Sequence, residues 1–177
     1  MLTFTSLGKT GIRIVGAGRN VSVFTEQAKE SSDLLLLSSP EEEPKGDTIS
    51  WPGEYDMTGI TIRGIGHEEG QQVSYLAIVD GVRCAFLSVP LRDWSEAQLE
   101  RLGDIDLLIL PAQDGKIAQK LVDDIDPRIL ILTPDEKGKI DPDMLKSCGA
   151  QGKEHVKEFK LKGALPAEGR EVVVFGE

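Results

Sequence analysis

The sequence is poor in the side chains that most often bind metals or cross-link a chain. It has two histidines, His67 and His155, and two cysteines, Cys84 and Cys148, in 177 residues. A catalytic zinc usually takes three protein ligands, mostly His, Cys or carboxylate, so the histidines alone do not supply one. Cys84 lies in an apolar, strand-like run and is predicted to be a buried thiol, with a single disulfide as the alternative. A reducing, cytoplasmic compartment fits this cysteine usage.

Long apolar runs and dense basic clusters are also missing. No apolar run approaches ~20 residues, and no apolar stretch follows a basic region at the start, so we expect neither a membrane span nor a signal peptide. The net charge is −10 and the pI is about 4.8, which argues against nucleic acid as a partner. Lys157, Lys160 and Lys162 come closest to a basic cluster, but Glu158 lies among them, as is typical of a solvated edge strand.

Several common catalytic motifs are absent from the sequence. It has no Gly-x-Ser-x-Gly elbow, no P-loop lysine motif and no EF-hand loop. Gly16 and Gly18 connect two predicted hairpin strands instead of opening a helix, so phosphate binding is not expected there. His67 follows a strand in the polar segment GHEEGQQ and is predicted to be an exposed loop histidine, and His155 is predicted to be solvated too.

The N-terminal half has the alternating apolar and polar pattern of half-buried strands. Asp80-Gly81 between two apolar runs predicts a two-residue hairpin turn. Residues 33–39 hold four consecutive leucines, which predicts a strand covered on both sides. Two prolines in the acidic segment 40–47 exclude a regular helix there. The other predicted strands are residues 2–5, 11–15, 21–25, 60–65, 75–79 and 82–87.

The C-terminal half alternates strands and helices. Ser95 and Gln98 have the spacing of a capping box, and Trp94 and Leu99 that of a hydrophobic staple, so a helix is predicted from there to Gly103. Further helices are expected at 116–125 and 142–148, and strands at 106–110, 128–132, 156–161 and 172–175. Strand–helix–strand units form parallel pairs. The pattern therefore predicts a single α/β domain over residues 1–177, with two sheets and flanking helices.

Several strings, in this order, resemble the small lactonase-like branch of the metallo-β-lactamase superfamily, which are zinc-dependent hydrolases. The strings are Pro52-Gly53-Glu54-Tyr55-Asp56, Gly81-Val82-Arg83, residues 99–103, residues 103–111 and residues 127–131. Together they extend over nearly the whole chain. The resemblance implies a four-layer αββα sandwich with mixed sheets flanked by helices.

The resemblance also implies where the zinc ligands of the family would stand. The motif His-x-His-x-Asp-His falls on Ser39, Glu41, Glu43 and Pro44 of this chain, the bridging Asp on Val89, and the last His near Pro134. The N-terminal Gly-His of many relatives is Gly8-Lys9 here. Because Val89 and Pro134 have no donor side chain, the metal site is predicted to be lost, together with the metal-activated water that hydrolysis requires.

These observations favour a non-catalytic member of the fold. We expect a pseudoenzyme that serves as a scaffold, subunit or ligand-binding protein, with a protein partner or a second copy of itself, and with no cofactor, nucleic acid or membrane. The alternative is a metal-dependent hydrolase with a remodelled, carboxylate-rich site built from Glu41, Glu43, His67 and Asp135. For the run that begins at Glu41, a solvated acidic loop is the competing interpretation.

Overall fold

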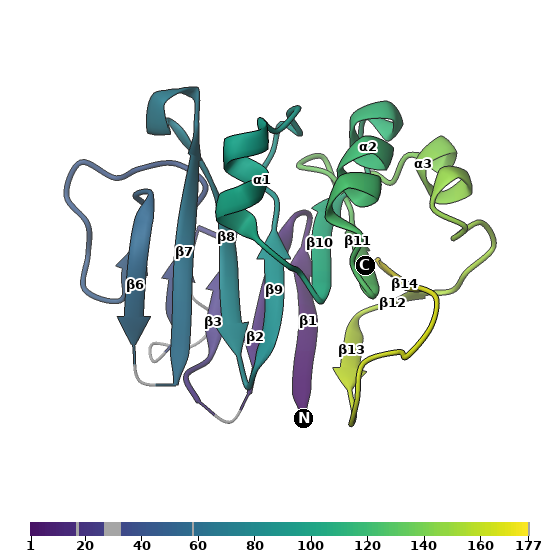
Figure 1. Cartoon of the computed structure of the whole chain (residues 1–177), viewed down its shortest axis with the longest axis horizontal. Coiled ribbons are helices and arrows are strands. Elements are labelled where there is room, and N and C mark those ends of the chain that lie inside the picture. Colours follow the sequence, from purple (N-terminus) through teal and green to yellow (C-terminus); the bar gives the residue numbers. More distant parts are fainter. Residues whose placement is uncertain (17, 27–32, 58, 177) are drawn as a thin grey trace.

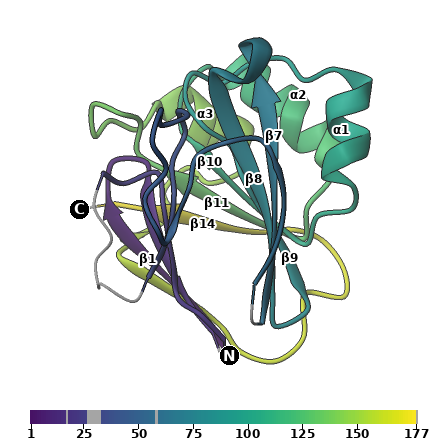
Figure 2. The same ribbon diagram turned by 90° about the vertical axis from the view of Figure 1, so that its left-hand side faces the viewer.

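The computed structural model of this protein describes residues 1–16, 18–26, 33–57 and 59–176. Within these residues the chain forms two β-sheets, three α-helices and a short 3-10 helix, η1 (Glu68–Gly70). The two sheets lie face to face, and the helices lie outside one of them (Figure 1 and Figure 2).

The first sheet has six strands in the order β13-β1-β2-β3-β4-β5. Strands β13, β1, β2 and β3 pair antiparallel, whereas β3, β4 and β5 pair parallel. The sheet is therefore mixed, as expected. Its strands are β1 (Leu2–Gly8), β2 (Gly11–Val15), β3 (Val21–Val23), β4 (Leu34–Leu36), β5 (Thr48–Ile49) and β13 (Glu158–Leu161).

The second sheet has eight strands in the order β12-β14-β11-β10-β9-β8-β7-β6. Strands β6, β7, β8 and β9 form an antiparallel meander. The neighbours from β9 onward, in the order β9-β10-β11-β14-β12, all pair parallel. Asp80 and Gly81 turn the chain between β8 and β9 with positive φ, as the hairpin signal predicted. The strands are β6 (Gly53–Met57), β7 (Ile60–His67), β8 (Gln72–Val79), β9 (Val82–Phe86), β10 (Leu107–Pro111), β11 (Ile129–Thr133), β12 (His155–Val156) and β14 (Glu171–Phe175).

The helices α1 (Glu96–Leu102), α2 (Gly115–Ile125) and α3 (Pro142–Ser147) cover the outer face of the eight-stranded sheet (Figure 2). The predicted capping box of α1 is confirmed, because Gln98 N donates to Ser95 Oγ and Ser95 N donates to Gln98 Oε1. The α/β class with mixed sheets is also confirmed. Within the described ranges the outer face of the six-stranded sheet carries no helix, so helices form one outer layer here.

Two apolar layers result from this arrangement. In β10, Leu107 and Ile109 face the other sheet, whereas Leu108 and Leu110 face the helices, and all four are buried. The four leucines of residues 33–39 predicted a strand covered on both faces in the same way. There Leu34 and Leu36 are buried, but Leu35 and Leu37 are half-buried, because their face of the sheet lacks the helical cover that β10 has.

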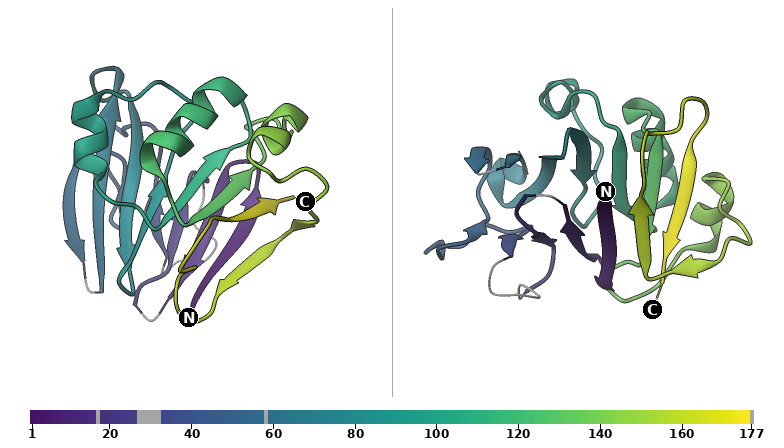
Figure 3. Two further views of the ribbon diagram at one scale, coloured as in Figure 1. Left: turned by 45° about the vertical axis from the view of Figure 1, so that its right-hand side comes forward. Right: turned by 90° about the horizontal axis from the view of Figure 1, so that it is seen from below.

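The chain crosses from one sheet to the other at both ends of the sandwich. Residues 50–52 connect β5 to β6, two strands that the periodicity did not predict. Pro52 packs on Gly66 of β7, where a Cβ atom would lie 2.9 Å from Pro52 Cγ. At the opposite end β12 leads directly into β13, and Ser6 N donates to Lys157 O at 2.9 Å (Figure 3). These crossings join the sheets into one body.

The remaining sequence predictions are also placed by the fold. Both cysteines are free; Cys84 is buried, and burial raises the pKa of its thiol. Strand β13 is an edge strand, as predicted, with Lys160 Nζ 2.7 Å from Glu158 Oε1. None of the helices in the described ranges has the length and apolar character needed to cross a bilayer.

Candidate functional site

The positions that the resemblance assigns to metal ligands lie at one edge of the sandwich, where strands end. Val89 follows β9 and Pro134 follows β11, and these strands run in the same direction within one sheet. Ser39 follows β4 in the other sheet. The two sheets are joined at this edge, because Val73 N donates to Ser38 O at 2.8 Å. The fold therefore places the ends of these strands at the same edge of the sandwich.

The side chains at these positions do not fit a zinc ion. Val89 and Pro134 offer no donor atom, and Ser39 offers a neutral hydroxyl. The backbone of Glu41 is fixed locally, since its N–H donates to Ser50 Oγ and its carbonyl accepts from Trp51 Nε1 at 2.9 Å. Glu43 and Pro44 are exposed in the loop after β4. In the described ranges, no three His, Cys, Asp or Glu residues are grouped closely enough to share a metal ion.

The four residues of the alternative metal site are not gathered either. Asp135 Oδ1 accepts the backbone N–H groups of Lys137 and Lys139 at 2.8 Å each, so this carboxylate closes a local turn. The side chain of His67 contacts Ser74 and Gln98 on the helix-covered face of the eight-stranded sheet. A shared site of Glu41, Glu43, His67 and Asp135 is thus not formed by these residues.

Aromatic rings occupy the space between the sheets near this edge. Tyr75 of β8 is fully buried, and its hydroxyl donates to Leu37 O at 2.5 Å and lies 3.0 Å from Ile49 O. The ring of Phe24, just after β3, lies 6.1 Å from the Tyr75 ring. Burial raises the pKa of Tyr75, so the hydroxyl stays a neutral donor. The Tyr75 hydroxyl thereby ties β8 to the ends of β4 and β5.

The structure corrects the prediction for His67. This residue is not an exposed loop histidine but the last residue of β7, and it is 5% exposed. Because side chains alternate along a strand, His67 shares a face with Ile65, which faces α1. Its ring packs edge-on against Trp94, with 4.8 Å between centroids. His155, in contrast, is exposed as predicted.

Hydrogen bonds fix the tautomer of His67, and burial keeps its ring neutral. Gln98 Oε1 accepts from Ser95 N, so Gln98 Nε2 must be the group that donates to His67 Nδ1 at 3.1 Å. A nitrogen that accepts this bond carries no proton, which leaves the proton of the neutral ring on Nε2, 3.2 Å from Ser74 Oγ. Burial, followed by the charge of Arg92, lowers the pKa of His67 to about 4.

The network continues to the segment after β9. Ser74 Oγ lies 3.0 Å from Ser88 Oγ, and Gln72 Nε2 donates to Ser88 Oγ and to Pro90 O. Arg92 donates from Nε to Gln72 Oε1 at 2.6 Å and pairs with Glu68. Each buried polar side chain in this chain of contacts has a partner, which is the arrangement of a structural clamp. The clamp ties the segment carrying Val89 to β8.

Sequence reasoning missed this clamp because its members are far apart in the chain. One usable signal was the capping box, which oriented Gln98. Another was the period-two alternation of the predicted strand 60–65. Extended by two residues, it places His67 on the same face as Ile65.

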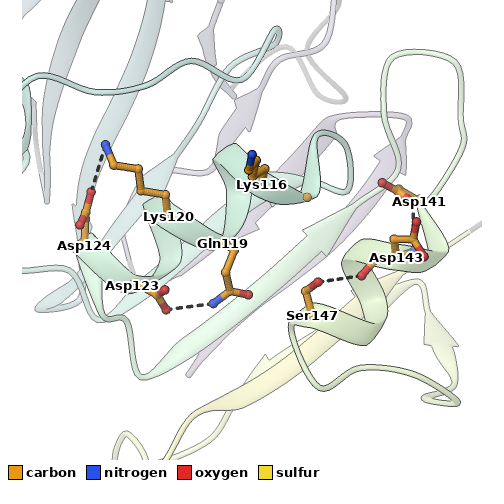
Figure 4. Close-up of a pocket in the computed structure, with 9 residues that line it drawn as sticks. Lys116, Gln119, Lys120, Asp123, Asp124, Asp141, Asp143 and Ser147 are labelled. Carbon is orange, nitrogen blue, oxygen red and sulfur yellow. Dashed lines mark hydrogen bonds and ion pairs between the residues drawn. The ribbon is translucent and has the colours of Figure 1, made fainter.

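A surface groove of about 740 Å³ lies between α2 and α3 (Figure 4). Gln119 Nε2 donates to Asp123 Oδ1, and Lys120 Nζ lies 2.5 Å from Asp93 Oδ1. Ser147 Oγ donates to the backbone of Asp143. These side chains bond to neighbouring protein groups, so they do not form a set of free donors and acceptors directed at a common ligand.

A second groove, of about 540 Å³, lies at the strand-end edge of the sandwich. It is lined by Leu7 to Thr10, Phe24 to Glu26, and Glu136. Lys9, which the resemblance places where the family has histidine, therefore lies at this groove, and its lining also contains the carboxylates Glu26 and Glu136.

Comparison with known proteins supports the fold. Neither a family model nor a curated protein matches the chain. A Thermotoga maritima protein assigned to the Zn-dependent hydrolases of the metallo-β-lactamase superfamily shares 20% identity at a TM-score of 0.80, over 99% of each chain. The metallo hydrolase Igni18 from Ignicoccus hospitalis shares 13% identity at a TM-score of 0.59, over 91% of this chain and 99% of its own.

A third structure gives the same result. YhfI from Bacillus subtilis, a metallo-β-lactamase fold protein, shares 9% identity at a TM-score of 0.57, over 98% of this chain and 96% of its own. This chain therefore has the metallo-β-lactamase fold. Identities this low establish the architecture and leave the activity to be argued from the site itself.

Proposed function

We propose that this protein is a non-catalytic, single-domain member of the metallo-β-lactamase fold that serves in the cytoplasm as a scaffold, subunit or ligand-binding protein. One observation carries the proposal: the strand-end positions that would hold zinc carry Val89 and Pro134, which have no donor atoms. A hydrolase of this kind lowers the pKa of water by metal coordination. Val89 and Pro134 cannot coordinate the metal that this step requires.

The packing around the site supports the same proposal. Tyr75 and Phe24 fill space between the sheets close to the edge where the strands end. The Tyr75 hydroxyl bonds across the sheets to Leu37 O and Ile49 O. The one buried histidine in the described ranges takes part in a structural clamp, and burial, followed by the charge of Arg92, lowers its pKa to about 4. The carboxylate of Glu43 is exposed, and that of Asp135 accepts local backbone N–H groups.

Metal analysis tests the proposal directly. Untagged protein should contain far less than one equivalent of zinc, manganese or iron by mass spectrometry, and added zinc should leave the melting temperature unchanged. The Thermotoga maritima protein serves as a comparison under the same protocol. A bound metal at one hundred times its Kd adds about 2.7 kcal/mol of stability, which for a chain of this length raises the melting temperature by roughly 5–10 °C. Stoichiometric metal with such a rise would overturn the proposal.

A further inference from the structure

Strand β6 (Gly53–Met57) forms a free edge of the eight-stranded sheet. It is the last strand in the sheet order, and its strand partner in the described ranges is β7 (Figure 1). At the other edge, the short β12 is followed at once by the crossing into β13. An edge strand presents unpaired N–H and C=O groups that another extended chain can bind.

The register shows which groups face outward. Val79 pairs with Val82 across the two-residue Asp80-Gly81 turn, and the pair beside such a turn exchanges backbone hydrogen bonds. Because bonded and non-bonded partners alternate from strand to strand, Ile60 bonds to Met57 and not to Val79. Pairs then alternate along an antiparallel ladder, so Tyr55 and Gly53 also bond to β7. The N–H and C=O groups of Glu54 and Asp56 therefore point to the free edge.

The two sides of β6 differ in chemistry. Tyr55 and Met57 lie on the inner side, where they pack against the core between the sheets. Glu54 and Asp56 lie on the outer side and are exposed. Glu54 is partly neutralised, because Arg63 Nε lies 3.0 Å from its carboxylate. Asp56 accepts a hydrogen bond from the neutral Thr61 hydroxyl, so it carries the uncompensated charge of the strand.

An exposed but fixed tryptophan stands next to this edge. Trp51 is 47% exposed, yet its indole N–H donates to Glu41 O and its carbonyl accepts from the Tyr55 hydroxyl. A ring already held in place loses little conformational freedom on binding, and tryptophan is enriched among residues that dominate interfaces. Glu42 and Glu43 are exposed in the loop that Trp51 contacts, which makes the surroundings acidic.

The same charges disfavour a second copy as the added strand. If two β6 strands paired antiparallel about Tyr55, Glu54 of one would stand opposite Asp56 of the other. Like charges directly opposite each other destabilise a strand pair, and this arrangement selects against self-association. A strand with basic side chains opposite Asp56 is favoured by the same geometry.

We propose that the free edge of β6 binds an extended segment of another protein as an additional strand. The segment alternates basic side chains, over Glu54 and Asp56, with apolar side chains, over Tyr55 and Trp51. Main-chain hydrogen bonds to Glu54 and Asp56 supply affinity, and the alternating side chains supply specificity. This inference goes beyond the proposed non-catalytic role and does not depend on it, since the added strand would bind backbone groups of β6 whether or not a metal is bound.

A peptide titration tests the proposal on the full chain. The probe is an acetylated, amidated nine-residue peptide that alternates lysine with valine or threonine, followed by amide NMR and hydrogen exchange. We expect the amides of Glu54 and Asp56 to become protected from exchange. A peptide of the same charge with N-methylated backbone groups should bind at least about tenfold more weakly, because it cannot form the ladder. A glutamate version should also lose binding.

Matched variants locate the site. Asp56→Lys should weaken binding of the lysine peptide about tenfold, and Trp51→Ala several-fold. Glu154→Lys makes the same charge change beside β12, at the far edge of the sheet, and should leave binding unchanged. Equal binding of the N-methylated peptide, equal losses in Asp56→Lys and Glu154→Lys, or absence of protection at Glu54 and Asp56 would each overturn the proposal. The metal analysis is a separate measurement, so the two proposals fail separately.

Discussion

Gln98 Nε2 lies 3.1 Å from His67 Nδ1, and this contact sets the tautomer of the one buried histidine among the described residues. The amide of Gln98 is oriented by Ser95 N–H at the start of α1. A local helix-capping motif therefore determines which ring nitrogen carries the proton in a residue 31 positions away in the sequence. The network that follows from it links β7, β8, the segment after β9 and α1.

The first prediction concerns stability below neutral pH. The folded pKa of His67 is lowered to about 4 from 6.5, so between these values the unfolded chain binds a proton that the folded chain does not. The contribution of His67 to stability is complete above pH 6.5 and is lost as pH falls toward 4. We expect a loss of about 2 kcal/mol, with allowance for screening by solvent.

Urea unfolding from pH 7.5 to 4 measures this effect. The His67→Gln variant should be less stable than the parent at pH 7.5, and the gap should shrink toward pH 4, whereas carboxylate titration affects both chains alike. His155→Gln changes an exposed histidine and serves as the control. A gap for His67→Gln that stays constant with pH would contradict the neutral buried state.

The second prediction reverses the electrostatics of the same contact. Gln98→Glu places a carboxylate where an amide now donates to Nδ1, so the imidazolium gains an acceptor for its second proton. An adjacent opposite charge favours the charged form. We expect the His67 pKa to rise well above its value in the parent, measured by NMR titration of the ring protons. An unchanged titration midpoint would show that Gln98 does not control this histidine.

The third prediction concerns the cross-sheet hydroxyl of Tyr75. Tyr75→Phe leaves Leu37 O without its hydrogen-bond donor in the closed edge, and an unsatisfied buried acceptor costs about 1–3 kcal/mol. Tyr55→Phe removes a hydroxyl that bonds to Trp51 O at the surface and should cost less than about 1 kcal/mol. Chemical unfolding of both variants makes the comparison. Equal losses would mean that the Tyr75 bonds do not hold the edge together.

The fourth prediction tests the crossing between β5 and β6. A Cβ atom at Gly66 would lie 2.9 Å from Pro52 Cγ and 3.3 Å from Gly70 Cα, whereas one at Gly46 meets nothing within 4 Å. Gly66→Ala should therefore destabilise the fold by about 1–3 kcal/mol. Gly46→Ala, the matched control, should change stability by less than about 0.5 kcal/mol. Thermal unfolding distinguishes them, and a neutral Gly66→Ala would show that the crossing is loosely packed.

The sequence by itself determined most elements of this protein. Period-two alternation predicted β2, Asp80-Gly81 predicted the β8–β9 turn, and Ser95 with Gln98 predicted the start of α1, because these signals act between residues close in the chain. The resemblance placed Val89 and Pro134 at the metal positions, and their side chains lack donors whatever the fold does.

The tertiary structure alone decided the burial of His67, the bond between Tyr75 and Leu37 O, and the free edge of β6. Each depends on which strands become neighbours, and pairing between distant segments leaves little trace in local composition. His67 was predicted to be a loop residue because the residues that follow it in the sequence, Glu68 and Glu69, are polar and interrupt the apolar alternation of the strand. Its partners Ser74, Trp94 and Gln98 come from other elements, which only the packed sheet and helix bring to its side.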